Sequence, residues 1–302
     1  MTWFLIALIC PLAYAFANQT DHYLIQKYMK GGEVGSLIIF SSIFSAIVLP
    51  IVYAFHPAAV DVPWQTILIL MADQALVVVA VLCYFYALHE DEASSVVSFY
   101  QTIPIMAYVL GFFILHESIK LSQGIASIVI LIGALILSVE SHEGSFRFKK
   151  KVVALMLFAS FLYAIETVIF KLIAVDIGFW PSLFWGMSGK VVMGILFLGL
   201  IPKYRRQFID MVKSNRPVVL GLNAASESFF IVGEVAGLYA AMLAPVALVL
   251  TVNSFQPLFV LILGVVLTLL MPQLKLEKLT KWRIIQKAAG IVLMGLGSLY
   301  IG

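Results

Sequence analysis

The chain has 302 residues, of which 62% are hydrophobic and 12% are charged, with a net charge of +3 and a mean hydropathy of +1.04. A water-soluble protein of this size cannot keep so much apolar surface away from water, so the composition predicts an integral membrane protein. The small net charge gives no reason to expect a nucleic-acid partner. Both cysteines, Cys10 and Cys83, lie in apolar runs, which argues against a disulfide framework.

Ten segments are apolar and long enough to cross a bilayer, for which a helix needs about 20 residues. None of them alternates with the two-residue period of a barrel strand. The sequence therefore predicts an all-α polytopic membrane protein with ten transmembrane helices. The segments are expected at 3–25, 35–54, 64–87, 93–115, 121–139, 151–172, 181–201, 216–239, 245–270 and 284–301.

Polar side chains interrupt the first and third segments. Asn18, Asp21 and His22 fall within one turn near the end of the first, where they either cap the helix at the interface or face a substrate path. Asp73 and Gln74 follow the first turns of the third segment. For Asp73 a buried partner, a solvated position at the interface and a place on the substrate pathway all stay open.

The fourth and ninth segments each contain a proline near the middle, Pro104 and Pro257. A proline inside a helix removes a backbone hydrogen bond and can kink the helix. We expect two matched kinks, which either shape and gate a cavity or are tolerated without any motion.

The sixth and seventh segments carry Glu166 and Lys190. An ionisable group inside the bilayer costs about 2.5–3.5 kcal/mol on insertion scales, so function or pairing is its default interpretation. Glu166 is a candidate for binding a proton or a substrate. Lys190 needs an anionic partner or ligand, and a counter-ion role toward Glu166, Glu227 or Glu234 is favoured over a clamp for a substrate carboxylate. Among the aromatic residues, the candidates for lining a cavity are Trp185, Tyr84 and Tyr239.

The eighth segment contains Asn223, Glu227 and Glu234. Spacings of four and seven residues place all three on one helical face. Two carboxylates on one face are not compatible with lipid exposure, so this face is expected to line the bundle interior or a water-filled hollow. It either binds a cationic or amino group and protons, or pairs with Lys171 or Lys190 to hold the helices together.

The pattern of the first half returns in the second half at a constant offset of 153 residues. This offset carries Tyr86–Ala87 onto Tyr239–Ala240, and it carries Gln74 onto Glu227. Each half has five segments, and an odd number means that the second half enters the membrane from the opposite face. We therefore expect two inverted five-helix repeats, residues 1–142 and 151–302, joined by a polar linker at 143–150. Such repeats are typical of carriers with a central site.

Basic residues are distributed unevenly between the two ends of the predicted bundle. Sixteen of the 19 Lys and Arg residues fall in connections after odd-numbered segments, and Lys120 alone falls in an even-numbered one. Positive charge favours the cytoplasmic side, so this count predicts that both chain termini lie outside.

The sequence resembles the EamA-type branch of the drug/metabolite transporter superfamily, over nearly its whole length. The stretches that carry the resemblance are Tyr84–Leu88, Glu92–Val97, Gln101–Pro104 and Leu115–Glu117, and in the second half Leu238–Ala240, Ala244–Val246, Gln256–Pro257 and Gly264. The second half departs from the pattern with Leu270 in place of Glu117 and with a basic insertion at 271–287. The resemblance implies ten helices, inverted repeats, export or exchange of small metabolites, and cytoplasmic termini, which contradicts the charge count. Glu166 is also similar in position to the proton- and substrate-binding glutamate of small multidrug transporters.

These patterns favour a secondary transporter of small metabolites, an exporter or exchanger in the cell membrane working by alternating access, with protons as the first candidate for coupling. We expect no cofactor, and a monomer or weak homodimer. No phosphate-binding loop of the G-x-x-x-x-G-K-[ST] type occurs in the sequence, so ATP is not expected to drive it. A channel and a non-transporting receptor stay open as alternatives.

An enzyme is the alternative from another class. Gly186–Gly189 resembles the serine motif of rhomboid-type proteases, but that chemistry needs a general base on a later helix. All five histidines precede Ser188, so we predict that the protein is not an enzyme. No cluster of cysteine and histidine residues indicates a metal site.

Overall fold

In the computed structural model, the described residues are 2–28, 34–90, 96, 99–138, 149–213, 217–270 and 281–301. Within these ranges every regular element is a helix. The predicted linker at 143–150 falls mostly outside them, as does much of the basic insertion after residue 270.

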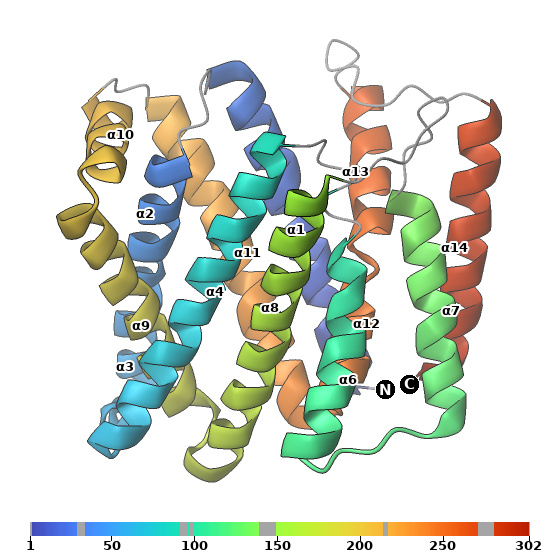
Figure 1. Cartoon of the computed structure of the whole chain (residues 1–302), viewed down its shortest axis with the longest axis horizontal. Coiled ribbons are helices and arrows are strands. Elements are labelled where there is room, and N and C mark those ends of the chain that lie inside the picture. Colours follow the sequence, from blue (N-terminus) through green and yellow to red (C-terminus); the bar gives the residue numbers. More distant parts are fainter. Residues whose placement is uncertain are drawn as a thin grey trace.

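The described residues of the first half form six α-helices and three short 3₁₀ helices (Figure 1). They are α1 (Thr2–Tyr28), α2 (Val34–Phe44), η1 (Ser45–Ile47), α3 (Val48–Phe55), η2 (Pro57–Val60), α4 (Trp64–Glu90), η3 (Phe99–Thr102), α6 (Ile103–Ile114) and α7 (Leu121–Ser138).

In the second half, seven α-helices are formed by the residues that the structure describes. They are α8 (Lys150–Ile177), α9 (Phe179–Leu200), α10 (Pro202–Lys213), α11 (Pro217–Leu243), α12 (Val246–Asn253), α13 (Gln256–Leu270) and α14 (Lys281–Ile301).

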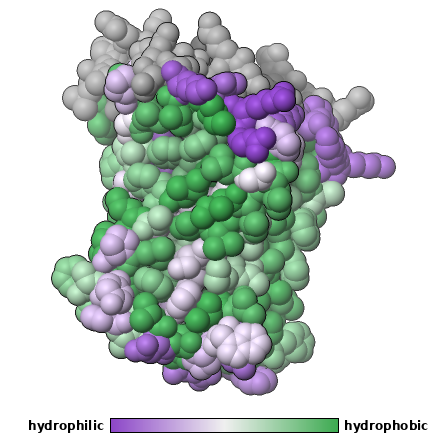
Figure 2. Space-filling model, turned by 90° about the vertical axis from the view of Figure 1, so that its left-hand side faces the viewer, coloured by the Kyte–Doolittle hydropathy of each residue, from purple (hydrophilic) through white to green (hydrophobic). Residues whose placement is uncertain are grey.

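The bundle has the surface of a membrane protein. Within the described ranges, seven helical segments are long and apolar enough to cross a bilayer, and three shorter apolar helices cover Phe99–Ile114, Leu121–Leu137 and Ile285–Ile301. Figure 2 shows a broad hydrophobic band on one face, with hydrophilic residues at both ends. The predicted all-α, multi-pass membrane class is therefore confirmed.

Glycines allow close helix contacts in the bundle. Gly133 on α7 and Gly290 on α14 face each other, and a Cβ added to either would lie 2.8 Å from the backbone oxygen of the other. Small residues let membrane helices approach in this way, because the apolar lipid provides little hydrophobic drive for helix association. α7 and α14 accordingly pack side by side (Figure 1).

The helix pairing follows a pattern that links the two halves. α1 packs along α11, and α4 packs along α8. α8 also packs on α6, while α1 packs on α12 and α13. Each contact thus joins one helix from the first half to one from the second, and the two halves interlock throughout the bundle.

We predicted that Pro104 and Pro257 kink continuous helices, and this prediction is wrong. Pro104 is the second residue of α6 and Pro257 is the second residue of α13. Proline is tolerated in a first helical turn, where its missing N–H would have no partner in the helix. Pro257 cannot donate to the carbonyl of Asn253, the last residue of α12, so the ninth predicted segment is divided into two helices. A 3₁₀ helix precedes α6 in the same way.

Candidate functional site

A cluster of acidic side chains lies inside the bundle, on helices from both halves. Its central contact is an ion pair between Lys190 on α9 and Glu234 on α11, with Lys190 Nζ 2.5 Å from Glu234 Oε2. The two side chains are 7% and 8% exposed. A buried pair of this kind is costly to break, because the remaining charge is left without a partner. Of the three predicted counter-ions for Lys190, the structure brings Glu234 to it.

Glu166 on α8 lies beside this pair and accepts two hydrogen bonds. Gln74 Nε2 on α4 donates to Glu166 Oε1 at 2.7 Å, and the Thr167 hydroxyl donates to Oε2 at 3.1 Å. Glu166 is close enough to Lys190 and Glu234 to interact with both electrostatically. The structure therefore joins predicted site residues from four helices into one centre.

Glu227, about two turns before Glu234 on the predicted face of α11, has a different partner. The Ser41 hydroxyl on α2 donates to Glu227 Oε2 at 2.8 Å. Asn223, on the same face, is buried and its amide nitrogen lies 3.8 Å from Met211 Sδ on α10. All three polar residues of this face thus point into the protein, toward α2, α9 and α10.

Three buried side chains of the predicted site have polar atoms without a hydrogen-bond partner among the described residues. These atoms are both carboxylate oxygens of Asp73 and the amide oxygen of Gln74, on α4, and the indole nitrogen of Trp185 on α9. Such groups are rare in folded proteins, since nearly all buried polar atoms are paired with protein or water. Asp73 is close enough to Glu166 for the two carboxyl groups to interact.

Asp21 does not cap the first helix, because α1 continues to Tyr28. It is instead partly buried near Ser226 and Glu227 of α11. α1 packs along α11, which explains how a residue from the start of the chain reaches this centre. The side chain of the neighbouring His22 lies outside the described part.

A cluster of three tyrosines lies beside the acidic centre, and two of them, Tyr100 and Tyr163, were missed in the sequence. Tyr84, Tyr100 and Tyr163 are in contact, with ring centroids 5.6 Å apart for the first two and 5.7 Å apart for the last two. Tyr163 is also close enough to Glu166 and Glu234 to interact with both. The available signal was the three-residue spacing between Tyr163 and Glu166, which places them on one face of α8.

A second acidic group that sequence reasoning had not placed in a site belongs to the connection between α6 and α7, a segment that runs along the lower end of the bundle in Figure 1. Glu117 Oε2 accepts the backbone N–H of Val246, the first residue of α12, at 2.8 Å. Its Oε1 forms an ion pair with Lys171 of α8 at 2.5 Å. A carboxylate at a helix N-terminus satisfies a free N–H and interacts favourably with the helix dipole. Lys171 therefore does not pair with the glutamates of α11, which was one predicted arrangement.

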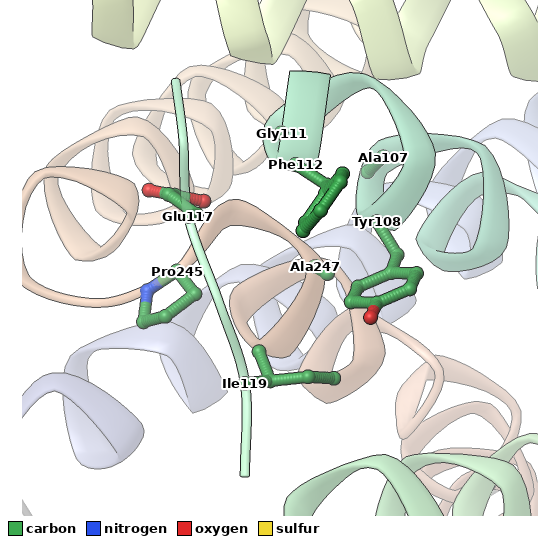
Figure 3. A pocket seen from close by; sticks show the side chains of 8 residues that line it. All are labelled: Ala107, Tyr108, Gly111, Phe112, Glu117, Ile119, Pro245 and Ala247. Atoms are coloured by element: carbon green, nitrogen blue, oxygen red, sulfur yellow. The ribbon is translucent and has the colours of Figure 1, made fainter. Parts of the chain in front are cut away.

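Glu117 also borders a shallow pocket that leaves almost no space for a water molecule (Figure 3). The pocket is lined by Ala107, Tyr108, Gly111, Phe112, Glu117, Ile119, Pro245 and Ala247. It is thus separate from the acidic centre. In the described part of the chain, the expected water-filled hollow is not open around Asp73, Glu166 and Glu234, each of which is buried.

The serine of the protease-like motif is occupied within its own helix. The Ser188 hydroxyl donates to the carbonyl oxygen of Phe184 at 2.8 Å. Among the described residues, no group of three or more His, Cys, Asp or Glu side chains is placed to hold a metal ion.

The phenol of Tyr204 anchors α10, which lies outside the spans. Burial, and to a lesser degree the hydroxyl of Tyr86 at 2.7 Å, raises the pKa of Tyr204 to about 12. The neutral phenol therefore persists across the physiological pH range, and it fixes this basic amphipathic helix against α4.

The fold and the centre define a class: a multi-pass α-helical membrane protein with a buried acidic cluster. Comparison with known proteins narrows this class. Residues 1–139 match the model of the EamA-like transporter family, which confirms the resemblance over the first half of the chain. No curated protein sequence matches the chain. A solved structure titled "Crystal structure of protein" is similar in fold, with a TM-score of 0.66 and 13% identity over 99% of this chain and 96% of its own.

Proposed function

We propose that the protein is a secondary transporter that moves small solutes carrying an amino group across the membrane. The observation that carries the proposal is an acidic centre of buried Glu166 and Glu234 and partly buried Glu227 on α8 and α11. Helices of the first half contribute the hydrogen-bond donors Gln74 and Ser41 to it. Carboxylates in a bilayer interior are costly, and in transporters they mark substrate and ion pathways. The family match of the first half supports the same activity.

We further propose ten membrane passes arranged as two inverted repeats, residues 1–142 and 151–302. Seven long helical segments and three shorter apolar helices support this number. The helix pairing supports the symmetry, because exchanging the halves turns the contact of α4 with α8 into that of α11 with α1. Pro104 and Pro257, at the start of α6 and α13, are matched in the same way.

In this mechanism the two repeats alternate between states that open the centre to opposite sides of the membrane. The burial of Asp73, Glu166 and Glu234 supports assigning the structure to a closed state of that cycle. An incoming ammonium group would compete with Lys190 for a carboxylate, and the tyrosines beside Glu166 would offer their ring faces to a cation. An ion or solute gradient would supply the energy, since the sequence lacks a phosphate-binding loop.

We propose that both chain termini lie on the outer, non-cytoplasmic side of the cell membrane. The two termini lie at one end of the bundle, and basic α10 lies at the other (Figure 1). Positive charge favours the cytoplasmic side. Alkaline phosphatase fused to the C-terminus should therefore be active and green fluorescent protein dark, whereas insertions after Lys213 should give the reverse. The opposite result at both sites would invert the orientation.

The test of transport begins with a thermal-shift screen of purified protein against amino-bearing metabolites, followed by uptake into proteoliposomes. Glu227→Gln should abolish saturable uptake and leave folding and insertion intact, because it removes the carboxylate while keeping the side-chain shape. Glu90→Gln, at the exposed partner of Lys151, is the matched control and should transport normally. Uptake that rises linearly with concentration would indicate a channel, and unchanged kinetics in Glu227→Gln would remove Glu227 from the mechanism.

A further inference from the structure

Asp73 stands apart from the other carboxyl groups of the acidic centre. It is 3% exposed, and neither of its carboxylate oxygens has a hydrogen-bond partner among the described residues. An ionised carboxylate buried without partners is strongly disfavoured, whereas a protonated carboxyl group carries no charge to solvate. The surroundings of Asp73 therefore suit its neutral form.

The helices that pack against α4 bring no free cation to Asp73. α8 contributes Glu166, whose negative charge makes a second charge at Asp73 less favourable. α9 contributes Lys190, which is engaged by Glu234. α2 has no ionisable side chain in Val34–Phe44. Asp73 thus faces one like charge, and the nearby positive charge is already neutralised.

Glu166 and Asp73 differ in the groups that hold them. Glu166 accepts hydrogen bonds from Gln74 and Thr167 and lies close to Lys190, so it can carry a negative charge. Asp73 has none of these supports. When two neighbouring carboxyl groups share one negative charge, the charge resides on the one that accepts hydrogen bonds and the proton on the other.

We propose that Asp73 is a proton-binding site, occupied in this structure, and that Asp73 and Glu166 together exchange this proton for a cationic solute. The exchange depends on the transport function proposed above. When an ammonium group enters beside Glu166, its positive charge permits a second carboxylate. The O–H bond of Asp73 then breaks and the proton passes to water, so one positive charge enters as another leaves. A metal-ion site is less well supported, because no cluster of ligands for a metal occurs among the described residues.

Infrared spectroscopy of the full chain in lipid nanodiscs tests the site without any substrate. Labelling the aspartates with ¹³C separates their carboxyl band from those of the glutamates. At neutral pH we expect a band of protonated aspartic acid that shifts in D₂O and is lost in Asp73→Asn. Asp176→Asn, the same change at an exposed position near the end of α8, should retain the band.

Four results would overturn the proposal. They are no labelled band in the natural protein, a band that persists in Asp73→Asn, a band that does not exchange in D₂O, and a band removed by sodium chloride but not by N-methylglucamine chloride. The absence of a labelled band from the natural protein would overturn the proposal even if Asp73→Asn fails to fold. The fourth would assign the site to a metal cation. Because no solute is used, a failed uptake screen would count against the transporter and not against the proton on Asp73.

Discussion

Two interfaces that the proposed repeat would exchange are built differently. α4 packs along α9, and a Cβ added to Gly189 would lie 2.5 Å from the carbonyl oxygen of Met71. A Cβ at Gly186 would lie 3.0 Å from Cγ of Gln74. The matching helices, α2 and α11, meet at few positions, one of which is the hydrogen bond from Ser41 to Glu227.

This difference shows how a symmetric pattern in sequence can support an asymmetric structure. A backbone contact between helices cannot open without losing packing along the whole interface, whereas a contact between polar side chains can be replaced by water or by a solute. We interpret the tight α4–α9 interface as the closed side of a cycle and the loose α2–α11 interface as the side that moves. If the halves exchange conformations, the tight interface loosens as the loose one tightens.

The largest loss of stability is expected when the ion pair between Lys190 and Glu234 is broken. This pair joins α9, a helix of the tight interface, to α11, a helix of the loose interface. Glu234→Gln should lower the free energy of unfolding by about 3–5 kcal/mol, because it leaves Lys190 buried without an anion. The midpoint of thermal unfolding in detergent measures the loss. The double variant Glu234→Leu with Lys190→Met should recover most of it, since it buries no charge. A double variant as unstable as Glu234→Gln would show that the pair does more than neutralise charge.

A smaller loss is expected when the tight interface is forced apart. Gly189→Ala places a methyl group against the backbone of Met71, and overpacking of this kind costs about 1–3 kcal/mol. The control lies on the same helix: a Cβ at Gly199 would meet nothing within 4 Å, so Gly199→Ala should not lower the unfolding midpoint. Equal midpoints for the two variants would mean that α4 and α9 are not held by this contact.

The smallest effect is expected at the loose interface. Ser41→Ala removes the hydrogen bond to Glu227, and a single hydrogen bond contributes about 1 kcal/mol. Glu227 is only partly buried, so water can replace the lost hydroxyl. Gln74→Leu, which removes the donor to buried Glu166 on the tight side, should cost more. Similar midpoints for both variants would indicate that the two interfaces exclude water equally, and would remove the distinction between them.

Much of the fold could be predicted from the sequence, because hydropathy and helical periodicity act over short distances along the chain. The apolar segments, the all-α membrane class and the common face of Asn223, Glu227 and Glu234 follow from local spacing alone. The inward orientation of that face follows from the cost of placing a carboxylate in lipid. The prolines were predicted less well, since a mid-segment proline fits both a kinked helix and the start of a new one.

The composition and periodicity of this chain determined by themselves that it enters a membrane as helices and that acidic residues lie inside the bundle. Only the tertiary structure decided that Lys190 pairs with Glu234, that Lys171 pairs with Glu117, and that Asp73 finds no hydrogen-bond partner in the described part of the chain. The physical reason is distance along the chain. These contacts join helices that are distant in the sequence. The rotation of each helix about its axis and its position along the membrane normal depend on the packing of the whole bundle, so local sequence patterns do not determine them.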